Sequence, residues 1–195
     1  MIINYLDKVP KVEKDVFIFK TAAVIGDVVL KKNSNIWFGA VVRGDVNSIV
    51  IGERTNVQDN ATVHVTSETH PVFIGNDVTI GHNAVIHGSF IDDRVLVGMG
   101  AILLDGCRIG KNTIIAANSV LRNGTVVPEG VLVAGNPAQI KREVTNEELK
   151  GLETSAANYV KYSGNYLTYS PDSIYSFKEM EKILEILHLK YGSSS

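Results

Sequence analysis

Three histidines in the first half of the chain have a spacing that could bind a metal ion. His82 and His87 are separated by four residues, and His64 precedes them. Neutral imidazole is a common ligand of zinc, and it also binds iron and cobalt. We therefore expect zinc at such a site, with iron or cobalt as alternatives. The three side chains can share one ion only if the fold brings them together.

The element that must position these histidines is a repeat of six residues. Ile, Leu or Val returns at positions 24, 30, 36, 42, then 51, 57, 63, then 74, 80, 86, then 91, 97, 103, 109, 115, 121 and 127. Period six fits neither an isolated helix nor an alternating strand. Three units instead make an 18-residue coil whose aliphatic side chains point into a triangular prism. The alternative is a β-sandwich of short strands, which would not hold this phase for so long.

Small residues mark the expected corners of the prism. Glycine follows many of the aliphatic residues and suits a close approach of two backbones. These glycines are Gly26, Gly52, Gly75, Gly81, Gly98 and Gly110. Asn or Asp also recurs at the corners, where left-handed backbone is tolerated. These residues are Asn33, Asp59, Asn76, Asn83, Asn112 and Asn118.

Interruptions of the repeat show which residues stack on one another. The step from 42 to 51 contains three extra residues and the step from 63 to 74 contains five, and both are expected to be loops. Once these are subtracted, the intervals between Arg43, His64 and His87 reduce to 18, so the three residues form one column. Adjacent coils lie about 4.8 Å apart, so two imidazoles of this column can reach one metal.

His82 does not join this column. It follows Ile80 by two residues, which places it on the preceding face and stacked over Asp59. A prism edge therefore separates it from His64 and His87. We predict that the histidines converge across a threefold interface, where the column of Gln58, Asp59 and His82 in one subunit opposes the column of Arg43, His64 and His87 in the next. A homotrimer would then hold three sites.

Several motifs together resemble the γ-class carbonic anhydrases over roughly residues 10 to 165. They are Arg43-Gly44-Asp45, Asn56-Val57-Gln58-Asp59-Asn60, His64, and the run from Ile80 to Gly88 that contains both other histidines. The resemblance implies a left-handed parallel β-helix, a homotrimer, and a divalent metal held by three histidines at subunit interfaces. It implies reversible hydration of CO2 to bicarbonate by a metal-bound hydroxide, since three-histidine zinc leaves one position for water and lowers its pKa to about 7.

The resemblance also implies roles for five other residues. The counterparts of Gln58 and Asp59 orient the bound water, although corner packing would equally explain both residues. The counterparts of Arg43 and Asp45 form an ion pair that places the arginine near the site, where its planar fork suits bicarbonate. The alternative is that Arg43 and Asp45 form only an ion pair between protomers, and both interpretations can hold together. Tyr159 matches a tyrosine that the C-terminal helix carries towards the site, with core packing as the alternative.

The chain departs from the best-studied branch of this family where protons are exported. Val46 occupies the position of a glutamate in that branch, and a long acidic loop is reduced to a short insertion with Glu68 as its carboxylate. CO2 hydration requires that a proton leave the site, so we predict slow turnover without a loss of metal binding. This pattern is similar to a short-loop bacterial subgroup. His70 and Glu68 could relay protons, or could be ordinary solvated loop residues.

Two other functions fit the same repeat. The segment from Val133 to Ala138, followed by Lys141 and Arg142, resembles the C-terminal signature of hexapeptide acyltransferases, which use coenzyme A. A lone histidine would serve as the base in acyl transfer, whereas these histidines are spaced as ligands. A non-catalytic metal-binding protein is the third possibility. Fold alone does not decide among them.

The composition narrows the range of possible partners and cellular compartments. The 195 residues carry a formal net charge of −2, which does not favour nucleic-acid binding. One cysteine excludes an intrachain disulfide and fits a reducing compartment. We find no secretory signal and no long apolar span, so we expect a cytoplasmic protein without a membrane segment.

The sequence divides into three segments. Residues 1–17 are expected to form a lead-in strand, residues 18–138 the β-helix, and residues 139–195 a C-terminal helical segment. Capping boxes start two helices in this last segment, one with Thr145 and Glu148 and one with Ser176 and Glu179. Apolar stripes follow each box, and each must be buried against another surface. The stripes are Leu149, Leu152, Ala156 and Tyr159, and Phe177, Met180, Leu184, Leu187 and Tyr191.

Overall fold

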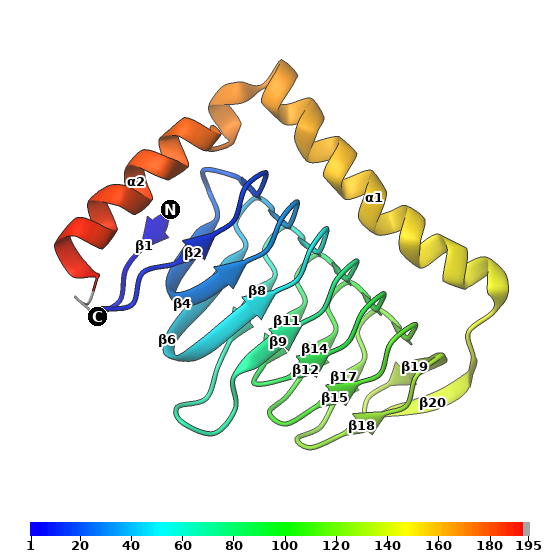
Figure 1. The fold of residues 1–195 in the computed structure, drawn as a ribbon. Coiled ribbons are helices and arrows are strands. Elements are labelled where there is room, and N and C mark those ends of the chain that lie inside the picture. Colours follow the sequence, from blue (N-terminus) through cyan, green and yellow to red (C-terminus); the bar gives the residue numbers. More distant parts are fainter. Residues whose placement is uncertain (193–195) are drawn as a thin grey trace.

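A computed structural model describes residues 1–192 and shows a parallel β-helix of about seven turns followed by two helices (Figure 1). The predicted prism and the C-terminal helices are therefore confirmed. Each coil contributes a short strand to each of three faces, and equivalent strands of successive coils pair in parallel. The β-sandwich alternative is wrong.

The prism has three faces: the histidine face, the second face and the third face. The histidine face contains the first halves of β4 (Ala23–Leu30) and β6 (Val41–Ile51), then β8 (Thr62–His64), β11 (Val85–His87), β14 (Ile102–Leu103) and β17 (Val120–Leu121). The second face continues from β4 and β6 through β9 (Val72–Ile74), β12 (Phe90–Ile91), β15 (Arg108–Ile109) and β18 (Val126–Val127). The third face contains β3 (Phe17–Ile18), β5 (Asn35–Ile36), β7 (Asn56–Val57), β10 (Thr79–Ile80), β13 (Leu96–Val97), β16 (Ile114–Ile115), β19 (Val131–Gly135) and β20 (Ala138–Glu143).

The six-residue repeat forms the core. Aliphatic side chains from all three faces meet inside the prism, and those at Ile51, Ile80 and Ile86 have no exposed surface. Burying such a side chain contributes roughly 1.5–3 kcal/mol relative to leaving it in water, so the repeat itself is the main source of stability. The corners leave little room, because a Cβ added at Gly81 would lie 2.7 Å from the backbone nitrogen of Met99.

The left-handed corner residues follow a simple rule. Each lies three positions before the next inward aliphatic residue, as Asn33 precedes Ile36 with a φ of 60°. The predicted Asn83, Asn112 and Asn118 obey it. The prediction was one residue early at two corners, where Asn60 and Asp77 have positive φ in place of Asp59 and Asn76. The reason is that the turn, and not the residue type, fixes which position is left-handed.

The two insertions take different forms. The three extra residues lie within β6, which bulges between Gly44 and Ile49 where β4 offers only Gly26 to Val28 as partners. The expectation of a loop there is wrong, because the strand continues through the insertion. The five extra residues form a true loop after β8, closed by an antiparallel bridge between Thr66 and His70.

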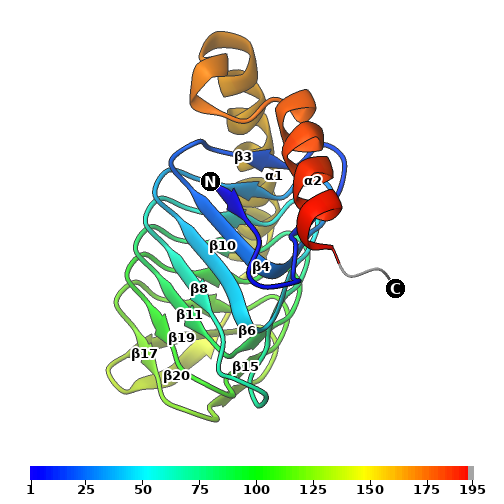
Figure 2. The same cartoon turned by 90° about the vertical axis from the view of Figure 1, so that its left-hand side faces the viewer.

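The ends of the chain cover the prism. β1 (Ile2–Ile3) and β2 (Lys11–Val12) pair with β4. Helix α1 (Asn146–Tyr169) runs along the third face over β5, β7 and β10, a short 3-10 turn η1 (Pro171–Ser173) follows, and α2 (Phe177–Tyr191) crosses the N-terminal end beside β1 (Figures 1 and 2). No helix within residues 1–192 combines the length and the apolar character needed to cross a membrane.

Both predicted capping boxes are present, with Thr145 and Ser176 accepting from the backbone of Glu148 and Glu179. The predicted apolar stripes are buried only in part. Leu152, Ala156 and Met180 are buried, and Leu184 and Leu187 pack partly against the core. Phe177 and Tyr191, at the two ends of α2, remain more than a third exposed.

Candidate metal centre

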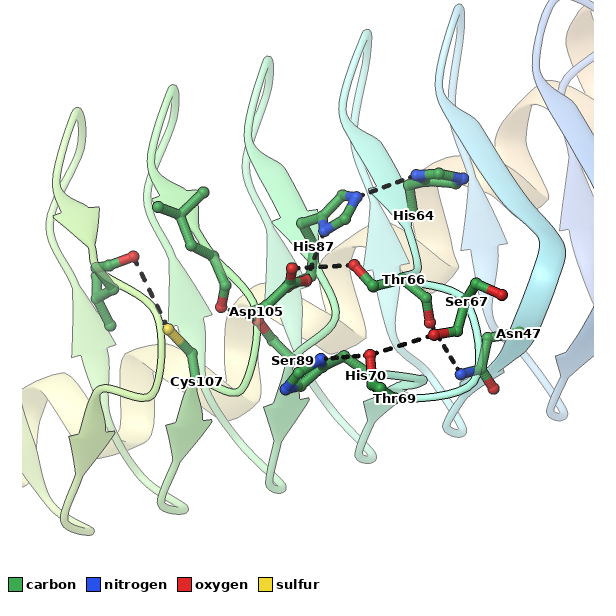
Figure 3. Close-up of polar contacts among 12 residues, drawn as sticks. Asn47, His64, Thr66, Ser67, Thr69, His70, His87, Ser89, Asp105 and Cys107 are labelled. Carbon is green, nitrogen blue, oxygen red and sulfur yellow. Dashed lines mark hydrogen bonds and ion pairs between the residues drawn. The ribbon is translucent and has the colours of Figure 1, made fainter.

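His64 and His87 lie side by side at the end of the histidine face. Arg43 pairs with His64, and His64 pairs with His87, in the register of the parallel strands. Nδ1 of His64 lies 3.1 Å from Nε2 of His87, and the rings meet at 61° (Figure 3). The column derived by counting residues is confirmed.

His82 lies at the opposite edge of the histidine face. It follows β10 at the corner where the chain leaves the third face, whereas His64 and His87 end their strands at the next corner. Within residues 1–192 of one chain, no group of three or more His, Cys, Asp or Glu side chains could hold a metal ion. The expected separation of His82 from the other two histidines within a subunit is therefore observed.

Each of the three histidines contacts a carboxylate. Nε2 of His64 lies 3.0 Å from Oδ1 of Asp45, and Nδ1 of His82 lies 2.8 Å from Oδ2 of Asp59. Nδ1 of His87 lies 2.6 Å from Oδ1 of Asp105. Carboxylates that accept from the second nitrogen of an imidazole fix its ring orientation, which is the usual environment of a metal-binding histidine.

Asp105 was not identified from the sequence. The repeat unit between Ile86 and Ile91 contains five residues instead of six, so the position aligned with His87 on the next coil is Leu104. Asp105 lies one residue further, and its side chain reaches back to the histidine. The sequence signal that could have identified Asp105 is its position directly after Leu104, the residue aligned with His87.

Burial and hydrogen bonding act in opposite directions on the Asp45 and Asp105 carboxyl groups. Burial alone would raise the pKa of Asp45, but hydrogen bonds from His64 and Arg43 and the charge of Arg43 outweigh burial, and its pKa lies below the ordinary value. Burial would likewise raise the pKa of Asp105, whereas hydrogen bonds from His87 and Thr66 lower it. Both side chains are therefore carboxylates at neutral pH.

The Arg43 guanidinium pairs with Asp45 within the same chain. The other oxygen of Asp45 accepts from the backbone NH of Val46 and faces His64. The arginine side chain stays 41% exposed, so it borders the histidine column without being enclosed. A cation is thereby held next to the two imidazoles.

Tyr159 and Asp59 border a hollow of about 410 Å³ together with His82. Tyr159 is half-buried and packs edge-on against Trp37, with ring centroids 5.2 Å apart. Burial, followed by the negative charge of Asp59, raises the pKa of the Tyr159 hydroxyl above its usual value. The residue therefore packs against the aromatic cluster and also faces the His82 corner.

Gln58 points elsewhere. Its side chain is buried, and its amide donates to Oδ1 of Asn56 over 3.0 Å. Asn56 in turn donates to Thr79 on the next coil. In this arrangement Gln58 belongs to a polar ladder beneath α1, next to the corner that carries His82.

The segment predicted to resemble an acyltransferase signature forms the end of the stack. Arg142 lies on β20 and donates two hydrogen bonds of 2.8 Å to the two carboxylate oxygens of Glu148. The Arg142 guanidinium is therefore already paired with a carboxylate in the first turn of α1. Lys141 is exposed beside it.

Comparisons with known proteins place the chain among hexapeptide-repeat proteins and γ-class carbonic anhydrases. A family profile described as "Bacterial transferase hexapeptide (six repeats)" matches residues 88–123. The chain is 43% identical to "Gamma carbonic anhydrase 2, mitochondrial" of Arabidopsis thaliana over 98% of its length and 69% of that protein. It is 37% identical to "Carbonic anhydrase" of Geobacillus kaustophilus, covering 85% of the chain and 90% of the relative. A solved "hexapeptide transferase family protein" from Anaplasma phagocytophilum is 41% identical, with a TM-score of 0.82 over 86% of this chain and 98% of that one.

Proposed function

Because the chain belongs to the hexapeptide-repeat family that includes the γ-class carbonic anhydrases, we propose that it catalyses the reversible hydration of CO2 to bicarbonate. The observation that carries this proposal is the placement of the histidines. His64 and His87 adjoin at one edge of the histidine face, and His82 lies at the other.

In a trimer whose histidine faces surround the threefold axis, the two different edges of this face meet at each boundary between subunits. His82 of one subunit would then meet His64 and His87 of the next, giving a homotrimer with three shared sites. Closed cyclic assemblies of this kind place one chain's residue in the partner's site by symmetry. The separation of His82 from the other two histidines within one chain supports this arrangement.

The residues present fit a divalent metal. His64 and His87 offer adjacent ring nitrogens, and all three histidines have carboxylate partners that orient them. We propose zinc, with iron or cobalt as alternatives, because imidazole accepts all three. The metal would supply the Lewis acidity that makes water nucleophilic near neutral pH.

The other residues would bind bicarbonate and orient water. Arg43, held by Asp45 beside the imidazole pair, offers a planar donor fork for bicarbonate. Asp59 and Tyr159 border the His82 corner, where a carboxylate and a hydroxyl can hold water in place. Gln58 would need to turn from Asn56 to take part.

The residues around this site offer little means of carrying a proton away from it. Val46 follows Asp45 and is 44% exposed, so an apolar side chain occupies the surface next to the arginine and histidine column. Glu68 is exposed at the tip of the short loop. We therefore propose slow hydration that is limited by proton transfer to the buffer.

Elemental analysis of anaerobically purified protein, combined with a CO2 hydration assay, tests the proposal. We expect one metal ion per chain and measurable hydration, both lost in His64→Ala and His87→Ala. His188→Ala is the matched control, since His188 is exposed on α2, where its ring contacts the Leu184 carbonyl, and should keep both. Metal content without hydration in zinc, cobalt and ferrous forms would leave a non-catalytic metal-binding protein.

An acyltransferase is the second candidate, since a relative of solved structure is named a hexapeptide transferase family protein. Coenzyme A would bind near Lys141 and Arg142 at the end of the stack. The ion pair of Arg142 with Glu148 opposes this. Coenzyme A binding that is lost in Lys141→Ala and unaffected by His64→Ala would favour acyl transfer.

A further inference from the structure

We propose that Asp105 is a positioning residue that holds His87 ready to bind the metal, with Thr66 holding Asp105 in turn. This inference rests on the proposed function. Asp105 Oδ1 lies 2.6 Å from Nδ1 of His87, and Asp105 Oδ2 accepts from the hydroxyl of Thr66 over 2.9 Å (Figure 3). Both carboxylate oxygens therefore have one partner each.

This contact selects the tautomer of His87. A carboxylate only accepts, so the neutral imidazole must carry its proton on Nδ1. Nε2 then keeps its lone pair, and it is Nε2 that faces His64. Without an acceptor at Nδ1, the proton could move to Nε2 and block the nitrogen that a metal would need.

The short loop and one corner glycine make room for this arrangement. The bridge between Thr66 and His70 closes the loop and fixes Thr66 above Asp105. Gly88 has a φ of 50°, and a Cβ there would collide with Oδ1 of Asp105. The loop after β8 therefore supports the carboxylate behind His87.

Asp105 offers a clean test because its side chain has no other described partner than His87 and Thr66 within residues 1–192. Asp45, by contrast, also binds Arg43 and Val46, so its replacement would disturb several contacts. Asp105→Ala removes the acceptor, and Asp105→Asn keeps the shape without the charge. Thr66→Val and Thr66→Ser form a matched pair that removes or keeps the hydroxyl.

The experiment measures metal affinity by competition with a chelator, and the tautomer of His87 by ¹⁵N NMR of the metal-free protein, with His87→Gln to assign its signals. We expect Asp105→Ala to bind zinc about 10- to 100-fold more weakly, the usual effect of losing such a partner. Its His87 should leave the Nδ1–H tautomer. Asp105→Asn and Thr66→Val should show smaller losses, and Thr66→Ser should behave like the wild type. Asp92→Asn, a corner aspartate whose side chain accepts from the Asp93 backbone, is the control.

Wild-type affinity and an unchanged tautomer in a folded, correctly assembled Asp105→Ala variant would overturn the inference alone. If metal binding depends on His87 and Asp105 but the protein does not hydrate CO2, the proposed function is overturned while the positioning role of Asp105 is supported. If the wild type binds no metal, both proposals fail.

Discussion

Nδ1 of His64 and Nε2 of His87 approach to 3.1 Å because their strands pair residue for residue. The proximity comes from backbone hydrogen bonding between parallel strands, and the core aliphatics at Val63 and Ile86 lock it by pointing inward from both coils. A shift of one residue would turn either imidazole into the core or away from its partner. The strand register of the β-helix therefore fixes the positions of the two histidines relative to each other.

Replacing His82 by alanine should remove the metal and weaken the trimer while the β-helix stays folded. The reason is that each proposed site takes His82 from one subunit and the other two histidines from its neighbour. Metal analysis, light scattering and circular dichroism measure the three effects. His188→Ala, on the exposed side of α2, should leave all three unchanged. One tightly bound metal per chain in His82→Ala would rule out shared sites.

Proton export should limit hydration. Concentrated imidazole buffer should raise turnover, because it accepts the proton that Val46 and the short loop do not carry away. Val46→Glu should raise turnover in dilute buffer by about tenfold, less than the 10²–10⁴-fold of a fully positioned general base. Val126→Glu adds the same charge at an exposed valine on the second face and should have no effect. Turnover that is independent of buffer in the wild type would contradict this explanation.

Arg43→Ala should impair bicarbonate dehydration while metal content stays near that of the wild type. Arginine is not a metal ligand, and its partner Asp45 retains the contacts to His64 and Val46. Steady-state kinetics in the dehydration direction and metal analysis test this. Arg108→Ala removes an exposed arginine of the second face and serves as the control. Loss of metal in Arg43→Ala would mean that the arginine has a mainly structural role.

Acid should weaken the start of α1. The hydrogen bond from Arg142, followed by that from the Thr145 backbone, lowers the pKa of Glu148 from 4.5 to about 2. A lowered folded-state pKa gives stability that is complete above about pH 4.5 and lost as the pH falls towards 2. Glu148→Gln should therefore reduce the melting temperature near pH 6 and make it less sensitive to acid over this interval. Glu147→Gln, in the same helical turn, should keep the wild-type slope.

The corner rule predicts different outcomes for two substitutions at one position. Asn33 has a φ of 60°, so Asn33→Ala should cost about 1–2 kcal/mol of unfolding free energy through left-handed strain. Asn33→Gly should cost less, because glycine adopts this backbone readily. Urea denaturation of both variants measures the difference. Equal losses would indicate that the Asn33 side chain, and not its backbone, stabilises the corner.

The sequence predicted the stacking of Arg43, His64 and His87 because the aliphatic core has a fixed period, and counting along it is equivalent to reading the strand register. It also predicted that His82 lies apart from them. Both results depend only on the position of each residue within a coil.

Side-chain direction was harder to predict. Asp105 reaches His87 from one residue beyond the column, and Gln58 turns to Asn56. Both outcomes depend on local hydrogen bonds that the period does not encode. The bulge in β6 was also missed, because an insertion of three residues can extend a strand as well as form a loop.

Strand β20 has a consequence for solubility. A stack of parallel coils can in principle grow by adding the first coil of another molecule to its last, as in a filament, because backbone donors and acceptors remain free there. On the third face β20 occupies that edge in the antiparallel direction, with Lys141, Arg142 and Glu143 exposed along it. At the other end α2 lies beside β1. β20 at one end and α2 at the other each cover part of the stack, so we expect a chain cut before Ala138, which loses both, to self-associate through the strand edge that the cut exposes.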